Sequence, residues 1–452
     1  MAALFFIMGI IMTGHSRRMT VFFILMVSVI FIVFTSGCSR RENRKSGYKV
    51  ISDDPDTLTV YAWDQSFNLP ALKAAEKAYR EKDPKFKLNI VLQSDSSDVE
   101  NALTSAGLSN DFSSLPDIVL FQDHYAKRYI EDFPKEWESL GDTDIDWENF
   151  SRDKVSMSEI DGAHYGVPVD NGTVIMAYRT DYLEASGHSI SEMDGITWSD
   201  FMNVARDVKA RTGKCMLSVN RNANPMPFIM MQAEGKSFFS KGKPAFTDNH
   251  MAEEILSVIV SMEKDGTLMM LDSQDRYNRS ISSDDVAAVM DGNWVLSKIR
   301  MNEESKGKWA ILPLPTMSGS RGYASTGGSS LFVTSNCHNK RLAKDFLRYT
   351  FGGGKGAMET YSHALTDGGL ISTYLPAIEL DAYKKTDDFF GGDAIYSKIL
   401  SYSAEVEPVE ESSYYYSARS YLSDAIQSVI EGHSLKRSLM EAQNKLTYLM
   451  EN

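Results

Sequence analysis

Aromatic and polar side chains stand at the ends of two segments that are predicted to be strands. Trp63, Asp64 and Gln65 close one alternating segment, and Gln122 and Asp123 follow a second, apolar one. An indole face stacks on flat apolar surfaces, while carboxylates and amides give and take hydrogen bonds. Such a set suits non-covalent capture of a small polar ligand. If two of the carboxylates faced each other, it would suit acid–base chemistry instead.

These residues need a scaffold that brings strand ends together, and the surrounding sequence predicts one. Alternation over 57–63 and 86–92 and a near-continuous apolar run at 116–121 predict three strands. Apolar residues three and four apart over 69–82 predict a helix, and 98–108 can form a second. Strands that alternate with helices at this spacing predict a parallel sheet with right-handed crossovers, and therefore an α/β fold.

The α/β rhythm continues to the end of the chain. After a leader of 37 residues about 415 residues remain, more than one compact core usually holds, so we expect two lobes. The further predicted elements are an extended segment at 165–178, helices at 201–211 and 251–264, strands at 309–315 and 329–334, a helix at 339–349, and helices at 418–431 and 435–450.

The N-terminal region predicts export from the cytoplasm. Arg17 and Arg18 precede the apolar run 19–34, and small residues then lead to Cys38. This order is typical of a secretory leader, and the cysteine resembles that of a bacterial lipobox, although Thr35 stands where leucine is usual. We expect a signal peptide at 1–37, lipid on Cys38 that anchors the protein to the cell membrane, and a polar tether over 38–56. The alternative is an uncleaved anchor, because 20–34 is about the shortest run that spans a membrane.

Charge and cysteine content exclude several classes. Loss of Arg17 and Arg18 with the leader would change a formal net charge of −14 to −16, which disfavours binding to nucleic acid. Only Cys215 and Cys337 remain after Cys38, too few for a disulfide framework or a zinc site. We expect both thiols to be unpaired and the protein to carry no metal or cofactor.

A set of short motifs, in order along the chain, carries a resemblance to a known family. The motifs are Leu58–Asp64, Leu115–Val119, Tyr165–Pro168 with Met176–Arg179, Thr197–Phe201, Ala287–Trp294, Leu312–Pro315 and Ala343–Leu347. The chain resembles the family 1 extracellular solute-binding proteins, the carbohydrate-capturing subunits of ABC importers, among which maltose-binding protein is a distant relative. Arg179 replaces the usual asparagine, and Met290 is one residue out of place.

The resemblance implies a periplasmic-binding-protein type II fold. Two α/β lobes would be joined by a hinge and would close over a ligand in the cleft between them. We expect the chain to cross near Pro168 and to return near Trp309. Lobe 1 would then contain 57–168 and 309–350, and lobe 2 would contain 169–308 and 351–452 with the C-terminal helices.

The resemblance also implies more ligand-binding residues. Trp294 fills the place where the family stacks an aromatic ring on the ligand, while Tyr415 and Arg419 stand where maltose-binding protein has an aromatic pair and a nearby arginine. The full predicted set is Trp63, Asp64, Gln65, Gln122, Asp123, Asp170, Asn171, Trp294, Gly328, Tyr415 and Arg419. Structural roles compete for some of them: Trp63 suits a core, Asp64 suits a helix cap, and His124 beside this set suits a structural role.

The expected function is therefore that of a membrane-anchored, extracytoplasmic carbohydrate-binding lipoprotein that delivers its ligand to the permease of an ABC importer. We expect a monomer without enzymatic activity. A binding protein of the same fold for a polyamine or other non-sugar solute stays open, because several candidate residues are acidic. A secreted glycosidase is the less favoured alternative, since it needs two carboxylates that face each other. The sequence contains neither Gly-x-Ser-x-Gly nor His-Glu-x-x-His.

Overall fold

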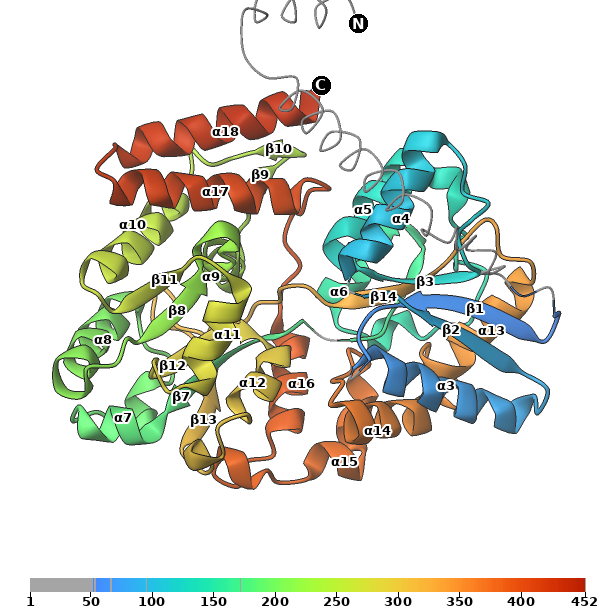
Figure 1. The fold of residues 1–452 in the computed structure, drawn as a ribbon, viewed down its shortest axis with the longest axis horizontal. Coiled ribbons are helices and arrows are strands. Elements are labelled where there is room, and N and C mark those ends of the chain that lie inside the picture. The colour runs from blue at the N-terminus through green and yellow to red at the C-terminus, as the bar shows by residue number, and fades with distance from the viewer. Residues whose placement is uncertain (1–51, 53, 66, 95, 171, 452) are drawn as a thin grey trace, which may run out of the picture. The chain divides into compact units, whose positions relative to one another are not determined.

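The computed structural model describes residues 52, 54–65, 67–94, 96–170 and 172–451. The predicted leader, Cys38, most of the tether and Asn171 lie outside these residues. The described residues belong to one compact unit. Within this unit the chain builds two sheet-centred regions, named lobe 1 and lobe 2 here (Figure 1).

Lobe 1 is built on a five-stranded sheet in the order β2-β1-β3-β14-β6. β1, β2 and β3 are parallel, and β14 is antiparallel to both β3 and β6. Every residue of β1 is buried, as expected of a central strand with both faces covered. The three strands predicted near the N-terminus are confirmed. The bounds are β1 (Thr57–Ala62), β2 (Lys87–Leu92), β3 (Ile118–Gln122), β6 (Gly166–Pro168) and β14 (Ser329–Val333).

Helices cover this sheet, and the helix predicted at 69–82 is confirmed as α3. The ring of Tyr79 on α3 packs edge-on against Phe86 at 4.6 Å, and Phe86 stacks on Phe346 of α13 at 5.0 Å. These rings join helix and strand into one core. The helices of lobe 1 are α3 (Asn68–Lys82), α4 (Ser96–Ser109), α5 (Asp123–Asp132), α6 (Arg152–Met157), α13 (Lys340–Thr350) and α14 (Ala357–Gly368).

Lobe 2 contains a three-stranded antiparallel sheet in the order β12-β7-β13 and a parallel pair, β8 and β11. An isolated β-bridge between the backbones of Cys215 and Val286 links the two sheets. The strands are β7 (Val174–Arg179), β8 (Leu217–Asn220), β11 (Leu268–Leu271), β12 (Ala288–Gly292) and β13 (Trp309–Leu312). The chain also contains two antiparallel two-stranded ribbons, β4 (Glu159–Ile160) with β5 (Ala163–His164), and β9 (Phe239–Ser240) with β10 (Lys243–Pro244).

Side-chain caps fix several helix starts in lobe 2. The hydroxyl of Thr197 accepts a hydrogen bond from the Asp200 N–H at 3.0 Å, and Gly213 ends the same helix at a φ of 75°. The Asn249 side chain caps the next long helix, α10, by accepting the Ala252 N–H. The helices of lobe 2 are α7 (Thr180–Ala185), α8 (Trp198–Thr212), α9 (Met226–Ala233), α10 (His250–Lys264), α11 (Gln274–Ser282), α12 (Leu296–Ile299), α17 (Tyr415–Ile430) and α18 (Leu435–Glu451). Two more helices, α15 (Asp381–Lys384) and α16 (Ile395–Glu405), lie in the stretch of chain between α14 and α17.

The chain passes between the lobes three times (Figure 1). The first crossing segment follows β6 and leads to β7, and the second (313–328) leads from β13 to β14. The third (369–414) leads from α14 to α17 and contains α15 and α16. The first two run side by side, since the Val174 N–H donates to the Ala324 carbonyl and the Thr326 N–H to the Gly172 carbonyl, each at 2.8 Å. Lobe motion must therefore bend paired backbone.

Two predicted lobe boundaries differ from the structure. Trp309 does not begin the return to lobe 1, because β13 pairs with β7 and stays in the sheet of lobe 2. The chain enters lobe 1 at Ser329 instead. The chain after 350 was expected in lobe 2, yet α14 packs on α3 of lobe 1, where Lys77 lies 3.4 Å from Glu359.

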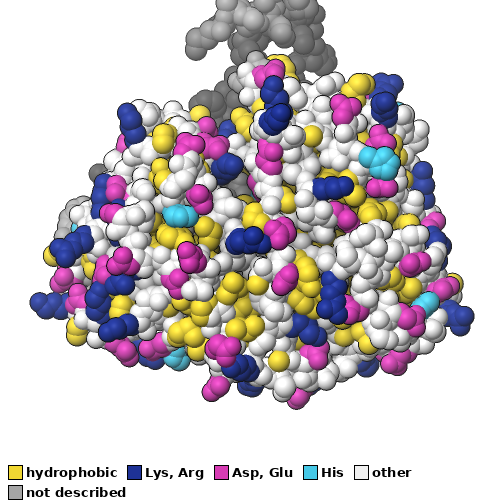
Figure 2. Space-filling view, turned by 180° about the vertical axis from the view of Figure 1, so that it is seen from behind, with side chains coloured by type: hydrophobic (Ala, Val, Ile, Leu, Met, Phe, Trp, Pro, Cys, Tyr) yellow, Lys and Arg dark blue, Asp and Glu magenta, His cyan; other side chains and the backbone are white. Residues whose placement is uncertain are grey.

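The surface carries charges of both signs. Figure 2 shows basic and acidic side chains interspersed over the described part of one face, a pattern that offers no continuous basic track to a phosphate backbone. Cys215 and Cys337 are buried free thiols. Among the described residues, no helix is long and apolar enough to cross a membrane, and no cluster of three or more His, Cys, Asp or Glu side chains is arranged to hold a metal ion.

Candidate functional site

A cavity of about 120 Å³ opens on lobe 2 beside the second crossing segment. Apolar side chains form part of its wall, and an indole, a phenol, a carboxylate, a guanidinium group and amides form the rest. The lining residues are Val219, Asn220, Ala223, Pro225, Gln274, Tyr277, Met290, Asp291, Trp294, Thr326 and Arg419. Two of the predicted ligand-binding residues, Trp294 and Arg419, therefore lie in one cavity.

A larger hollow of about 860 Å³ lies on lobe 1, between α3 and α13. Several of its charged groups are paired with one another. Lys344 Nζ lies 2.8 Å from Asp142, and Arg348 lies 3.1 Å from Asp345, which also pairs with Lys82. This hollow combines surface ion pairs without an aromatic wall open to a ligand, so the cavity in lobe 2 is the better candidate.

The strand β12 places a carboxylate at the inner end of the cavity. Asp291 is 8% exposed. The Tyr277 hydroxyl donates to its Oδ2 at 2.8 Å, and the Gly292 N–H donates to its Oδ1 at 2.8 Å. Burial raises the pKa of Asp291, while these hydrogen bonds and the charge of Arg419 oppose the rise. The carboxylate is thus held rigidly, with lone pairs left to accept hydrogen bonds from a ligand.

Two glycines make room for the indole of Trp294. A Cβ on Gly292 would lie 2.2 Å from the ring, and a Cβ on Gly327 would lie 3.1 Å from it. The ring therefore folds back over Gly292 and rests against the second crossing segment. The Trp294 side chain keeps 40% of its surface exposed, so it offers a flat apolar face to a ligand.

Arg419 reaches the cavity from α17. Its Nε donates to the Ala223 carbonyl at 3.0 Å, and a terminal nitrogen binds the same oxygen. In the same cavity, the Asn220 amide lies 3.4 Å from the Gln274 side-chain oxygen. These groups supply donors and acceptors around the indole face, the arrangement that a ligand rich in hydroxyls requires.

The predicted residues at the end of β1 have other contacts. Asp64 Oδ1 accepts the Phe67 N–H at 2.9 Å, just before α3, whose own N-cap position has no side-chain hydrogen bond. Trp63 is half-buried and packs against the core of lobe 1. Gln65 lines a different hollow, with Lys73 of α3. Their roles in ligand binding stay predictions.

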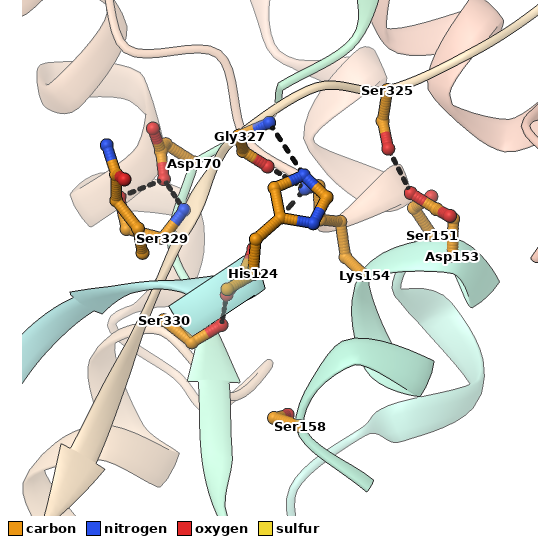
Figure 3. Close-up of polar contacts among 12 residues, drawn as sticks. His124, Ser151, Asp153, Lys154, Ser158, Asp170, Ser325, Gly327, Ser329 and Ser330 are labelled. Atoms are coloured by element: carbon orange, nitrogen blue, oxygen red, sulfur yellow. Dashed lines mark hydrogen bonds and ion pairs between the residues drawn. The ribbon is translucent and has the colours of Figure 1, made fainter. Parts of the chain in front are cut away.

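Gln122, Asp123 and Asp170 make contacts with other side chains of the protein. The Tyr416 hydroxyl donates to Gln122 Oε1 at 3.0 Å. Asp123 is fully buried, with its Oδ2 3.3 Å from Lys154 Nζ and its Oδ1 accepting the Ser330 hydroxyl at 2.6 Å. Asp170 accepts the Ser329 hydroxyl at 2.6 Å (Figure 3). The two aspartates therefore bind the protein itself in this structure.

Lys154 is the cation of this buried network. Its side chain on α6 is 1% exposed, and its Nζ donates to Asp123 and to the Gly327 carbonyl. Burial lowers the pKa of Lys154, but the negative charges of Asp123, Asp153 and Asp170 raise it by more. The net shift of the pKa is therefore upward, and the lysine is charged. A Cβ on Gly328 would lie 2.6 Å from Lys154 Nζ, so Gly328 leaves room for the lysine.

Tyr415 is part of a stack between the lobes. It is 2% exposed, its ring lies 3.8 Å from that of His124 at an angle of 4°, and it meets Phe228 edge-on at 4.6 Å. Tyr415 therefore packs against protein rings in this structure. The neighbouring Tyr416 stacks on Tyr125 at 4.2 Å, so this short run connects α17 to α5.

Comparison with known proteins identifies the family. A family model described as a bacterial extracellular solute-binding protein matches residues 74–389, well over half of the chain. This chain belongs to the bacterial extracellular solute-binding proteins. The predicted family is thereby confirmed.

Relatives and solved structures agree with this family. The lactose-binding protein of Rhizobium radiobacter is 32% identical over 355 residues, which cover 78% of this chain and 83% of that protein. The arabinooligosaccharide-binding protein of Bacillus subtilis (strain 168) is 24% identical over 404 residues, 87% of this chain and 90% of that protein. The ABC transporter associated binding protein from B. animalis subsp. lactis Bl-04, solved with β-1,6-galactobiose, superimposes with a TM-score of 0.67 at 20% identity over 86% of this chain and 96% of that one. The predicted type II fold is confirmed.

Several residues of this solute-binding protein were not predicted. Asp291 lies inside the motif that identified Trp294, so the motif contained a signal for it. Tyr277, Gln274 and Asn220 reach the cavity from other elements and carry no local pattern. Lys154 lies in a helix of six residues, and no pattern in the neighbouring sequence predicts a buried cation.

Titration of Asp170 gives a testable consequence. Burial raises its pKa to about 6, although the hydrogen bonds from Ser329 and the charge of Lys154 lower it. Because the unfolded value is about 3.9, the folded state holds this proton more tightly, and the contribution of Asp170 to stability falls as pH rises from about 4 to about 6.

Replacing Asp170 with asparagine should remove this dependence while keeping the acceptor for Ser329. Relative to the wild type, Asp170→Asn should gain about 2 kcal/mol in unfolding free energy between pH 4 and pH 7. Urea unfolding at both pH values measures the difference. A difference that does not change with pH would show that Asp170 is ionised already at pH 4.

Proposed function

We propose that this solute-binding protein captures a carbohydrate at the cavity of lobe 2 and delivers it to the permease of an ABC importer. The observation that carries the proposal is the exposed indole of Trp294 beside Asp291 and Arg419 in one cavity. A sugar ring has an apolar C–H face that stacks on an indole, and hydroxyls that bind carboxylate, amide and guanidinium groups. The lobes close over the ligand by bending the three crossing segments.

The names of the relatives support the substrate class. Two of them are lactose-binding and arabinooligosaccharide-binding proteins, and the solved binding protein contains a galactobiose. A neutral oligosaccharide of a few rings is therefore the proposed ligand. Arg419 disfavours the polyamine alternative, because its guanidinium charge in the same cavity would repel a cationic ligand.

The cavity also favours binding over hydrolysis. A glycosidase places two carboxyl groups on either side of the scissile bond. Among the described residues that line the cavity, Asp291 is the single carboxylate. We therefore propose that the protein binds its sugar without changing it.

The extracellular family supports a location outside the cytoplasm. We propose that lipid on Cys38 anchors the protein there and that it acts as a monomer. This location brings the loaded protein to the permease, and the cytoplasmic ATPase of the importer then drives transport.

Thermal melting against a ligand panel tests the function. The full-length protein, in a detergent without a sugar headgroup, is melted with lactose, arabinooligosaccharides and maltose, with spermidine and amino acids as controls. A ligand at about 100 times its Kd stabilises the folded state by about 2.7 kcal/mol, so the midpoint should rise with one sugar class and with neither control.

Other results would change the proposal. A rise with spermidine alone would keep the fold and overturn the substrate class. Slow consumption of a sugar, followed by chromatography, would overturn the assignment as a binding protein. No rise with any member of the panel would contradict capture of these sugars at the cavity.

A further inference from the structure

A glycine in the second crossing segment is held by side chains of lobe 1. The Gly327 N–H donates to His124 Nε2 at 3.1 Å, and the Gly327 carbonyl accepts from Lys154 Nζ. His124 and Lys154 come from α5 and α6, and both are buried (Figure 3). Both polar groups of this residue are therefore fixed from the same side.

The other side of Gly327 touches the candidate ligand site. Its φ of +72° is favourable for glycine, and a Cβ there would lie 3.1 Å from the Trp294 ring. The preceding residue, Thr326, lines the cavity itself. Gly327 thus forms a support for the indole, and its position depends on the two hydrogen bonds from lobe 1.

The partners of His124 define its protonation. Its Nδ1 lies 2.9 Å from a carboxylate oxygen of Glu411, which in its ionised form only accepts, so Nδ1 carries the proton. Its Nε2 faces the Gly327 N–H and must accept. The stack on Tyr415 fixes the ring plane. His124 therefore presents one donor and one acceptor, each to a different segment.

We propose that His124 is a positioning residue for the ligand site. Its Nε2 holds the Gly327 N–H, and the backbone of Gly327 in turn fixes the resting place of the Trp294 indole. His124 does not line the cavity, so its effect is transmitted through Gly327. The effect on sugar affinity rests on the proposed function, whereas the effect on the indole does not.

A pair of amide substitutions separates the two hydrogen bonds of the ring. In His124→Asn, the side-chain amide can replace Nδ1 as donor to Glu411, but nothing reaches Gly327. In His124→Gln, the side-chain oxygen can replace Nε2 as acceptor for the Gly327 N–H, while the donor to Glu411 is lost. Both variants lose the aromatic stack on Tyr415, so any general loss of packing is common to both.

The first readout needs no ligand. Acrylamide quenching of Trp294 fluorescence is measured in the full-length wild type and in both variants. The chain has six tryptophans, so the Trp294 signal is the difference between each protein and its version with Trp294→Phe. Quenching should rise in His124→Asn and stay near the wild-type value in His124→Gln.

The second readout uses lactose as the probe. An unpaired buried N–H should lower lactose affinity about tenfold in His124→Asn, with little loss in His124→Gln. If lactose fails to bind the wild type, this counts against lactose as substrate, and the quenching result decides the role of His124. Equal quenching in the two variants, whether raised or unchanged, would overturn the positioning role.

Discussion

Replacing Lys154 with methionine should lower the free energy of unfolding by about 3–5 kcal/mol at pH 7, because it leaves buried carboxylates without their cation. Lys154 is 1% exposed, and Asp123 beside it is fully buried. Asp153 and Asp170 also face the lysine charge. Methionine fills a similar volume, so the loss is mainly electrostatic. Urea unfolding of wild type and variant measures it.

A surface lysine provides the matched control. Lys77 lies 3.4 Å from Glu359, close to the 3.3 Å of the Lys154–Asp123 pair, but its side chain is 64% exposed. Lys77→Met should therefore cost about 0–1 kcal/mol. An equal loss in the two variants would show that burial does not make Lys154 special.

The deficit of Lys154→Met should also depend on pH. Without the lysine, the buried carboxylates bind protons more tightly in the folded state than in the unfolded state. The stability of the variant should therefore rise as pH falls from 7 toward 4, and its deficit relative to the wild type should narrow. A deficit that is constant over this range would point to lost packing instead.

The parts of the fold that sequence predicted are those fixed by local pattern. Alternation, a near-continuous apolar run and helical spacing located β1, β2, β3 and α3, because each of these elements carries its pattern within one short segment. The prediction that β13 belongs to lobe 1 was wrong, because the lobe of this strand depends on a pairing that is distant in the sequence. The pattern of Trp309–Leu312 predicts a strand but not the sheet to which the strand belongs. Only the pairing of this strand with β7, far away in the sequence, assigns it to lobe 2.

The contrast between local patterns and contacts that are distant in the sequence also explains which site residues were predicted. Trp294 was predicted from the family motif Ala287–Trp294. The structure adds a local reason for the motif, because Gly292 must be small for the ring to fold over it. Asp123 and Asp170 were expected to face a ligand as polar residues after strands. They bind Lys154 and Ser329 instead, partners that are 31 and 159 residues away in the sequence. These two polar residues at strand ends therefore make contacts within the protein, close to the crossing segments.

Replacing Trp294 with alanine should remove most sugar binding without unfolding the protein. The indole offers the largest aromatic face in the cavity, and such anchors contribute about 2–4 kcal/mol, which corresponds to a loss of roughly 30- to 1000-fold in affinity. The side chain is 40% exposed, so its removal leaves no sealed core cavity, and the melting midpoint without ligand should change little. Calorimetric titration with the sugar that raises the melting midpoint of the wild type measures the affinity.

Two further variants make the result specific to a flat ring in this cavity. Trp294→Phe keeps a smaller aromatic face and should retain more affinity than the alanine variant. Trp147→Ala removes a tryptophan of lobe 1 that stacks on His164 at 4.2 Å and does not line the cavity, so affinity should stay at the wild-type value. If Trp294→Ala bound the sugar as tightly as the wild type, the ligand would lie elsewhere in the interlobe region. The residues at the ends of β1 and β3 would then be the next candidates, because they are the predicted ligand contacts on lobe 1.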